Sequence, residues 1–225
     1  VTDLEVNPNN PTEFYVAYAS GGLWHTKNNG TTFSPIMDNS MTQNIGDFAI
    51  DWKSNSIYVG TGESNSSRSS YPGIGILKSN DNGSTWTNIG LRDSHHISRV
   101  LVNPNNENHI VVAVIGHLYT KNTQRGIFTS FDNGQTWKKS LFINDNTGAI
   151  DLVVDPENFD IQYAASWERE RKAWNFVGSG DNSGIYKSID GGKNWELITT
   201  KSSGFPTGDG VGRIGLSIFN SSIIY

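Results

Sequence analysis

Apolar and polar residues alternate along short stretches of this chain, and turns rich in Asn, Asp, Pro and Gly separate the stretches. The apolar runs at 14–17, 110–113 and 161–164 each follow a turn of the form Val-Asn-Pro-Asn-Asn or Val-Asp-Pro-Glu-Asn. Alternation with a period of two is typical of half-buried strands, and Asn, Pro and Gly favour the turns between them. The pattern therefore predicts an all-β chain of repeated four-stranded meanders.

A second pattern, a short glycine motif, recurs in register with the first at 25–33, 78–86, 129–137 and 187–195. The spacings between its central glycines are 53, 51 and 58 residues. This period is close to the roughly 40 to 50 residues of a four-stranded propeller blade. We therefore expect a β-propeller of four-stranded antiparallel blades.

The repeat also predicts the domain organisation. We expect one propeller segment over 1–225, with blades at about 1–37, 45–90, 97–142 and 149–199 and the start of a fifth blade at 211–225. In that fifth blade, 212–218 is the expected first strand and 222–225 the start of the second. Because a closed propeller leaves few open strand edges, we expect about four and a half blades here to belong to a larger ring, with the remaining blades as a partner.

Composition narrows the classes of function. Aromatic residues make up 11% of the 225 residues and supply bulk for a core, although hydrophobic residues amount to 35%. The net charge of −5 argues against nucleic acid as a partner, and no apolar run is long enough to span a bilayer. The absence of Cys excludes disulfides and thiolate nucleophiles.

The glycine motif has a structural chemistry of its own. Glycine supplies the positive φ of a tight turn, Ser, Asp and Thr side chains satisfy the turn's N–H groups, and the following Trp packs against neighbouring strands. A calcium site is not expected, because an EF-hand loop needs a Glu at its twelfth position and flanking helices. The residues given this structural role are Ser79, Asp81, Gly83, Trp86, Ser130, Asp132, Gly134, Trp137, Ser188, Asp190, Gly192 and Trp195.

The form Ser-x-Asp-x-Gly-x-Thr-Trp resembles the Asp-box, or BNR repeat, of sialidase-like and sortilin-like propellers. The second and third copies are complete, the fourth has Asn194 in place of Thr, and the first has Thr26, Asn28 and Phe33. Together with segments such as 59–65 and 167–176, the chain is similar to bacterial BNR-repeat proteins of the sortilin (VPS10-like) type, often labelled glycosyl hydrolases. The resemblance implies a propeller fold and an extracytoplasmic location: secreted, periplasmic or at the cell surface.

Three long connections between second and third strands are the expected ligand-binding region, because loops on a rigid scaffold usually carry binding. Aromatic rings and guanidinium groups there suit stacking on a sugar or peptide and gripping a carboxylate. The alternative is that the tryptophans pack onto the propeller and the charges pair internally. The candidate ligand-binding residues are Arg68, Tyr71, His117, Trp167, Arg169, Arg171 and Trp174.

Catalysis is a weaker expectation. Glycoside hydrolysis needs two flanking carboxylates, and the weak candidates are Glu63, Glu168 and Asp209. Sialidase activity is not expected, since no Arg-Ile-Pro motif occurs. We expect no cofactor and no metal site, because His95 and His96 are adjacent and point in opposite directions in an extended chain, while His117 is a lone histidine.

The sequence leaves three functions open. The first is a non-catalytic propeller that binds a peptide, protein or glycan on its loop-rich face. The second is a glycoside hydrolase acting on polysaccharide through paired carboxylates. The third is a structural or assembly module of a larger surface protein.

Overall fold

The computed structural model describes residues 1–220 and 223–225. Its strands form four sheets of four strands and two small two-stranded sheets, with one 3₁₀ turn, η1 (Arg92–Ser94). The first two large sheets contain β1 (Asp3–Val6), β2 (Phe14–Tyr18), β3 (Gly22–Thr26), β4 (Ser34–Pro35), and β5 (Ile45–Asp51), β6 (Ser56–Thr61), β7 (Ile76–Ser79), β8 (Thr87–Asn88). The next two contain β9 (Ile97–Asn103), β10 (Asn106–Val114), β11 (Gly126–Ser130), β12 (Lys138–Leu141), and β13 (Thr147–Val154), β14 (Gln162–Glu168), β17 (Gly184–Ser188), β18 (Glu196–Leu197).

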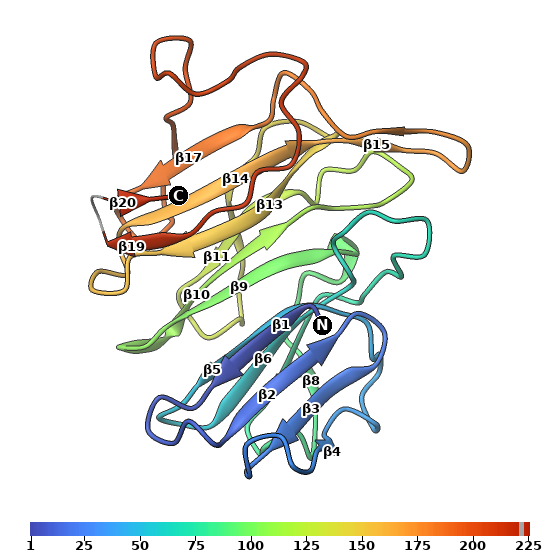
Figure 1. Cartoon of the computed structure of the whole chain (residues 1–225), viewed down its shortest axis with the longest axis vertical. Coiled ribbons are helices and arrows are strands. Elements are labelled where there is room, and N and C mark those ends of the chain that lie inside the picture. Colours follow the sequence, from blue (N-terminus) through green and yellow to red (C-terminus); the bar gives the residue numbers. More distant parts are fainter. Residues whose placement is uncertain (221–222) are drawn as a thin grey trace.

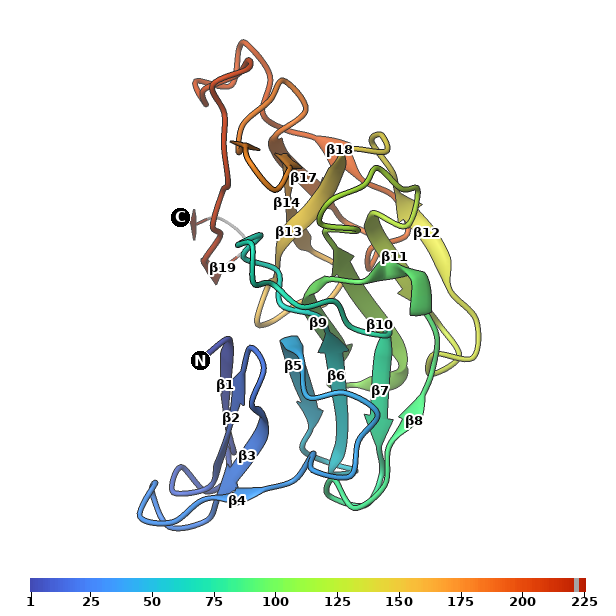
Figure 2. The same cartoon turned by 90° about the vertical axis from the view of Figure 1, so that its right-hand side faces the viewer.

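The large sheets are antiparallel meanders with the strands in chain order from the inside outward. The fourth sheet differs by an inserted hairpin, β15 (Glu170–Arg171) with β16 (Phe176–Val177), between its second and third strands. Figure 1 shows the sheets stacked in succession, and Figure 2 shows them fanning out with β1, β5, β9 and β13 on the inner side. This radial arrangement of meanders is that of a β-propeller.

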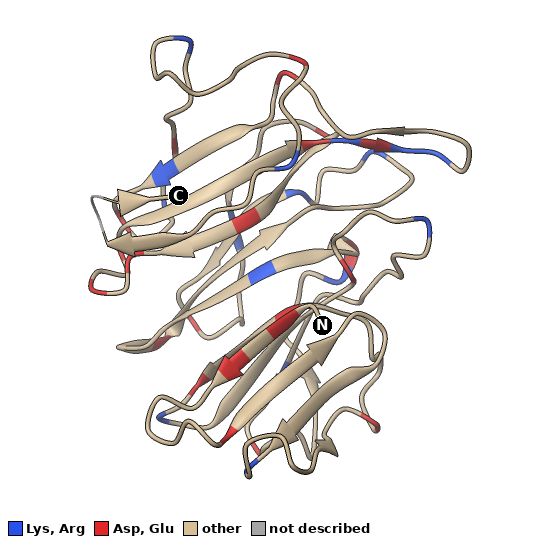
Figure 3. Ribbon diagram, viewed as in Figure 1, with Lys and Arg blue, Asp and Glu red and all other residues tan. Residues whose placement is uncertain are grey.

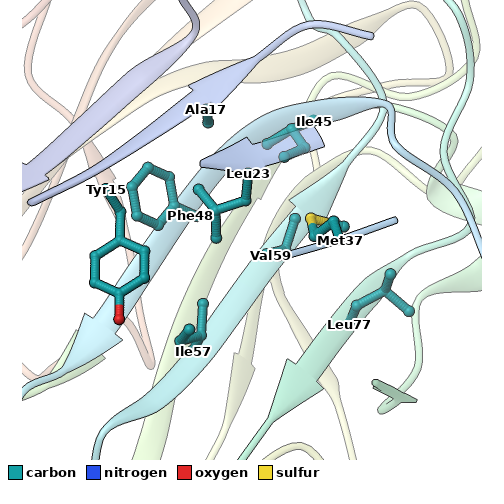
Figure 4. Close-up of a cluster of buried hydrophobic side chains, with 9 residues drawn as sticks. All are labelled: Tyr15, Ala17, Leu23, Met37, Ile45, Phe48, Ile57, Val59 and Leu77. Atoms are coloured by element: carbon teal, nitrogen blue, oxygen red, sulfur yellow. The ribbon is translucent and has the colours of Figure 1, made fainter. Parts of the chain in front are cut away.

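The core lies between successive sheets. Nine buried residues, among them Leu23, Phe48 and Val59, fill the space between the first and second sheets (Figure 4). A second cluster around Ile97 and Val112 separates the second and third sheets, and further clusters follow. Each sheet is therefore held mainly by apolar burial against its neighbours, at roughly 25 cal/mol per Å² of apolar surface.

Each of the four glycine turns is closed by a similar set of side-chain hydrogen bonds, which we call the cage. In the second copy, Ser79 Oγ donates to Asp81 Oδ1 (2.8 Å) and accepts from Gly83 N (2.8 Å). Asp81 Oδ1 also accepts from Thr85 N (2.8 Å), and Asp81 Oδ2 accepts from Thr85 Oγ1 (2.6 Å). These bonds lower the pKa of Asp81 to about 2. The Asn and the Gly of this turn both have positive φ, 55° and 86°, which Asn and Gly tolerate best.

The substituted copies keep the same cage. Asn194 Nδ2 donates to Asp190 Oδ2 (2.7 Å), in the role of the missing Thr hydroxyl. In the first copy, Thr26 Oγ1 accepts from Gly30 N (3.0 Å) and Asn28 Oδ1 accepts from the backbone of Thr32 (2.9 Å). The turn therefore depends on hydrogen-bond capacity at these positions more than on residue identity.

The tryptophans after the second, third and fourth turns reach the preceding sheet. Trp86 Nε1 donates to Ile36 O (3.2 Å) and Trp137 Nε1 to Ile89 O (2.8 Å). Trp195 Nε1 instead donates to Ser140 Oγ (3.2 Å) and to Gly192 O within its own turn. The structural role expected for the motif thus includes a bond between neighbouring sheets.

The end of the chain differs from the expectation. The segment 212–218 was expected to be a strand, but a ladder begins only at β19 (Ile218–Asn220), which pairs with β20 (Ile223–Ile224). Before β19 the chain runs along β13, where Leu216 N donates to Asp151 Oδ2 (2.9 Å) and Ile214 packs against the fourth sheet. Ser222, the expected start of the second strand, lies outside the described residues.

Replacing Ser130 with Ala should destabilise the protein by about 1 to 3 kcal/mol, because it leaves the buried Gly134 N–H without its acceptor. The measurement is urea unfolding followed by tryptophan fluorescence. Ser84→Ala is the matched control, since Ser84 is exposed and donates to a turn carbonyl, and its effect should stay within about 0.5 kcal/mol. Equal effects of the two changes would contradict the role given to the cage.

Candidate functional site

The long connections between strands meet at one end of the sheets, on the right of Figure 1. Tyr119 Oη, between β10 and β11, donates to Arg68 O (3.0 Å), between β6 and β7. Asn122 N donates to Asp145 O (3.1 Å), in the connection from the third to the fourth sheet. These bonds join loops of different sheets into one loop-rich end, as expected from the topology.

The β15–β16 hairpin projects from this end and is fastened at its base. Arg171 Nε and Nη2 both donate to Ser66 O, at 2.9 and 2.7 Å, and the Phe176 ring centroid lies 4.0 Å from the Arg171 guanidinium carbon. The turn of the hairpin carries Trp174, whose side chain is 84% exposed. The hairpin therefore presents a large aromatic ring to solvent on an anchored base.

Two predicted ligand-binding residues have interior positions, which corrects the expectation that they face a ligand. Trp167 is 4% exposed, packs with Ile150 and Ala165, and donates from Nε1 to Gly178 O (2.9 Å). Arg169 is 2% exposed and points its guanidinium at carbonyl oxygens of the loop after β10. Both side chains are occupied by the protein's own groups, so the alternative of loop packing applies to them.

Of the remaining predicted residues, His117 lines a small pocket. Arg68 and Tyr71 are exposed on the loop after β6. The pocket measures about 190 Å³ and is lined by Ser70, Pro72, His95, His96, His117, Leu118, Tyr119 and Thr120. Its size suits one side chain or small group rather than a chain of sugars, since sites for whole ligands usually measure about 300 to 1,000 Å³.

His117, expected to be a lone histidine, is stacked on His95 with ring centroids 3.6 Å apart and an interplanar angle of 15°. Asp93 Oδ1 lies 3.3 Å from His117 Nε2 and 4.0 Å from His95 Nε2, so the three side chains bring possible metal-ligating atoms together. Metal-binding lone pairs lie in the plane of each imidazole, and in stacked rings they run side by side instead of converging. The arrangement is a histidine stack rather than a formed metal centre.

His96 is not stacked with these two rings, and its ring lies edge-on to that of His95 with the centroids 6.4 Å apart. Its side chain is buried, and Nδ1 donates to Glu63 O (2.8 Å). Burial, together with the positive charge of Arg169, lowers the pKa of His96 to about 4. His96 is therefore neutral at neutral pH and fixes the start of the loop after β6.

Two of the three candidate acids serve local structure. Glu63 is buried and accepts from Ser70 Oγ and from Asn65 N (2.6 Å). Glu168 accepts from Asn182 N (3.0 Å) and Asn182 Nδ2 (2.9 Å), while Asp209 is exposed. Glu63 and Glu168 thus stabilise the loops that carry them.

A charged cluster that the sequence analysis did not select lies on the inner strands. Arg99 on β9 donates from Nε to Asp151 Oδ1 (2.8 Å) on β13 and from Nη1 to Asp47 Oδ1 (3.1 Å) on β5. Figure 3 shows the acidic and basic positions along β1, β9 and β13. The sequence spacing indicates this cluster, since each partner is separated from Arg99 by 52 residues, which is one repeat.

Burial raises the pKa values of acidic residues in this inner region. Desolvation raises the pKa of Asp47 well above its ordinary value although Arg99 opposes the shift. Desolvation and then the charge of Asp3 raise the pKa of Glu5 to about 7. The inner strands therefore hold carboxyl groups that retain protons more strongly than exposed ones.

Comparison with known proteins supports the repeat and the fold. A model of the BNR/Asp-box repeat matches residues 128–139, the third copy of the turn. The structure of an ancestral GH74 enzyme matches with a TM-score of 0.65 and 22% sequence identity, and the match covers 89% of this chain and 24% of that enzyme. The structure of a Niastella koreensis GH74 enzyme matches with a TM-score of 0.61 and 23% identity, and the match covers 87% of this chain and 29% of that enzyme. YCF48 bound to D1 peptide has 0.52 and 14%, over 91% and 54%.

These similarities define a β-propeller that carries BNR/Asp-box repeats. The chain spans about a quarter of the length of the two GH74 structures and about half that of the YCF48 structure. No curated protein matches the chain. In the described part, 1–220 and 223–225, no helix is long and apolar enough to cross a membrane.

Replacing Glu5 with Gln should change how stability depends on pH. The folded-state pKa of about 7 lies above the ordinary 4.5, so the stability contributed by Glu5 is fully present below about pH 4.5 and is lost as the pH rises through about 7. The variant should gain about 1 to 2 kcal/mol relative to the native protein between pH 5 and pH 8, after allowance for solvent screening. Urea unfolding at the two pH values measures this gain, and the exposed Glu157→Gln should show none.

Proposed function

We propose that this protein is a non-catalytic propeller that binds a peptide or protein ligand on its loop-rich end. The single observation that carries the proposal is Trp174, 84% exposed at the tip of a hairpin whose base is bonded to Ser66. Exposed aromatic rings on rigid supports bind at low entropic cost, and Trp and Tyr are enriched among residues that dominate binding energy. Tyr71 and Tyr119, 57% and 50% exposed, add aromatic surface to the same end.

The pocket beside Tyr119 supports a peptide rather than a glycan. Its apolar wall includes Pro72 and Leu118, and its volume of about 190 Å³ suits a single protruding side chain. The structural similarity to YCF48, whose structure contains the D1 peptide, is in keeping with peptide capture by this fold. The same proposal includes an extracytoplasmic location. It also includes association with further blades, because Leu4, Val6 and Tyr18 leave apolar surface on the first sheet 42 to 48% exposed.

Glycoside hydrolysis is the second candidate, favoured by the structural similarity to GH74 enzymes. Two of its three candidate carboxylates, Glu63 and Glu168, accept hydrogen bonds from their own loops, which already gives each of them a structural role. Assay of the protein against plant and bacterial polysaccharides separates the two functions. Release of reducing sugar that is lost in Glu63→Gln would replace the binding proposal with hydrolysis.

Trp174→Ala should weaken ligand capture by at least about tenfold, since loss of a central aromatic costs more than about 1.4 kcal/mol. The probe is the strongest binder from a random peptide display library, with a glycan array as the parallel arm, and affinity is measured by calorimetry. Phe131→Ala is the matched control, because Phe131 is 45% exposed in an Asp-box turn away from the loop-rich end. Unchanged affinity in Trp174→Ala, or binding to glycans and to no peptide, would contradict the proposal.

A further inference from the structure

Arg125 and Arg169 are buried side by side at the loop-rich end without a carboxylate partner. They are 1% and 2% exposed, and no acidic oxygen lies within ion-pair distance of either guanidinium in the part of the chain that the structure describes. Buried charges are costly unless they are paired. Two such charges close together therefore need an explanation.

Backbone carbonyls solvate these arginines but do not neutralise them. Arg125 donates to Ile115 O (2.6 Å), His117 O (2.8 Å) and Thr120 O (2.9 Å). The bonds from Arg169 are longer, at 3.2 Å to Leu118 O and 3.4 Å to Gly116 O. A carbonyl dipole carries no net charge, so two positive charges remain in a region of low dielectric.

One donor on each arginine is still free. Among the described residues, Arg125 Nε and Arg169 Nε are buried nitrogens without a hydrogen-bond partner. Burial and then the charges of Arg125 and Arg171 lower the pKa of Arg169 to about 9, and burial lowers that of Arg125 to about 10. Both groups remain cationic at neutral pH, and the charge of Asp145 opposes the effect of burial on Arg125 only in part.

A cavity of about 40 Å³ lies at this place. Its lining includes Arg125, Arg169, Arg171 and Lys121, which brings four cationic residues to one small space. Glu170 also lines the cavity, but its carboxylate lies 3.3 Å from Lys172 Nζ. Lys121 Nζ lies 3.8 Å from Asp145 Oδ1, and both residues are exposed.

We propose that this cavity is a binding site for one small monovalent anion, a halide or a carboxylate, held between Arg125 and Arg169. The volume exceeds the roughly 10 to 15 Å³ that one water requires, so a small anion fits. An anion there supplies the negative charge that the surrounding carbonyls lack and an acceptor for charge-assisted hydrogen bonds. The site does not use Trp174 or the ligand proposed above, although Arg171 belongs both to the cavity and to the base of the hairpin.

The test starts from untagged protein in chloride-free buffer, to which chloride is then added. The ³⁵Cl NMR line width measures how much of this chloride is bound. The native protein should broaden the line, and bromide in crystals should give an anomalous peak in the cavity. Arg169→Met, which keeps an unbranched apolar side chain and removes the guanidinium charge, should weaken chloride binding by at least about tenfold. Lys121→Gln changes only an exposed lining residue and should weaken it about two- to tenfold, which keeps the test decisive if Arg169→Met folds poorly.

Arg92→Met is the matched control, because Arg92 is exposed in η1 and does not line the cavity; its chloride binding should equal that of the native protein. Sodium acetate distinguishes the two kinds of anion. Displacement of chloride by acetate shows that the site accepts carboxylates, and chloride binding that resists acetate shows a halide site. A native line width no greater than that of Arg169→Met, or bromide absent from the cavity, would overturn the proposal.

Discussion

Apolar burial between successive sheets holds this structure together, and the Asp-box tryptophans fix where neighbouring sheets meet. The cage of Ser130, Asp132 and Gly134 fixes the turn, and the fixed turn places Trp137 where its indole N–H reaches Ile89 O. Gly134 is needed here for two reasons, since its φ is 82° and a Cβ at this position would lie 2.6 Å from Ile89 Cδ1. One local turn thereby sets the contact between two sheets, and its repetition sets the succession of sheets.

Much of this scaffold was predictable because the information is local. Turn, cage and tryptophan lie within nine residues, so their spacing in the sequence reports their geometry, and Asn194 fills the Thr position because it offers a donor of similar reach. The inner cluster of Arg99 was predictable in principle, since repeat spacing places its partners on adjacent inner strands. Opposite charges one period apart are the sequence signal of such a cluster.

The candidate site was less predictable because its contacts join distant parts of the chain. Arg171 bonds to Ser66 across 105 residues, and Arg169 bonds to the loop after β10 across 51 to 53. Nothing near Trp167 or Arg169 in the sequence indicates that a neighbouring loop will cover them. The segment 212–218 shows a related limit: Ile214 and Leu216 pack against the fourth sheet, so their apolar alternation reports burial and not membership of a ladder.

The two ends of the sheets use charge in opposite ways, and this difference is in keeping with the proposed binding at the loop-rich end. At the turn end, Asp81 and Asp132 are held as anions by hydrogen bonds from their own turns, so their charges are satisfied within each turn. At the loop-rich end, Arg125 and Arg169 hold the loop after β10 through its carbonyls, which orders the backbone but leaves their net charge in place. The same bonds that make the loops rigid therefore leave a positive potential beneath them, and an anion can respond to that potential without any change in the scaffold.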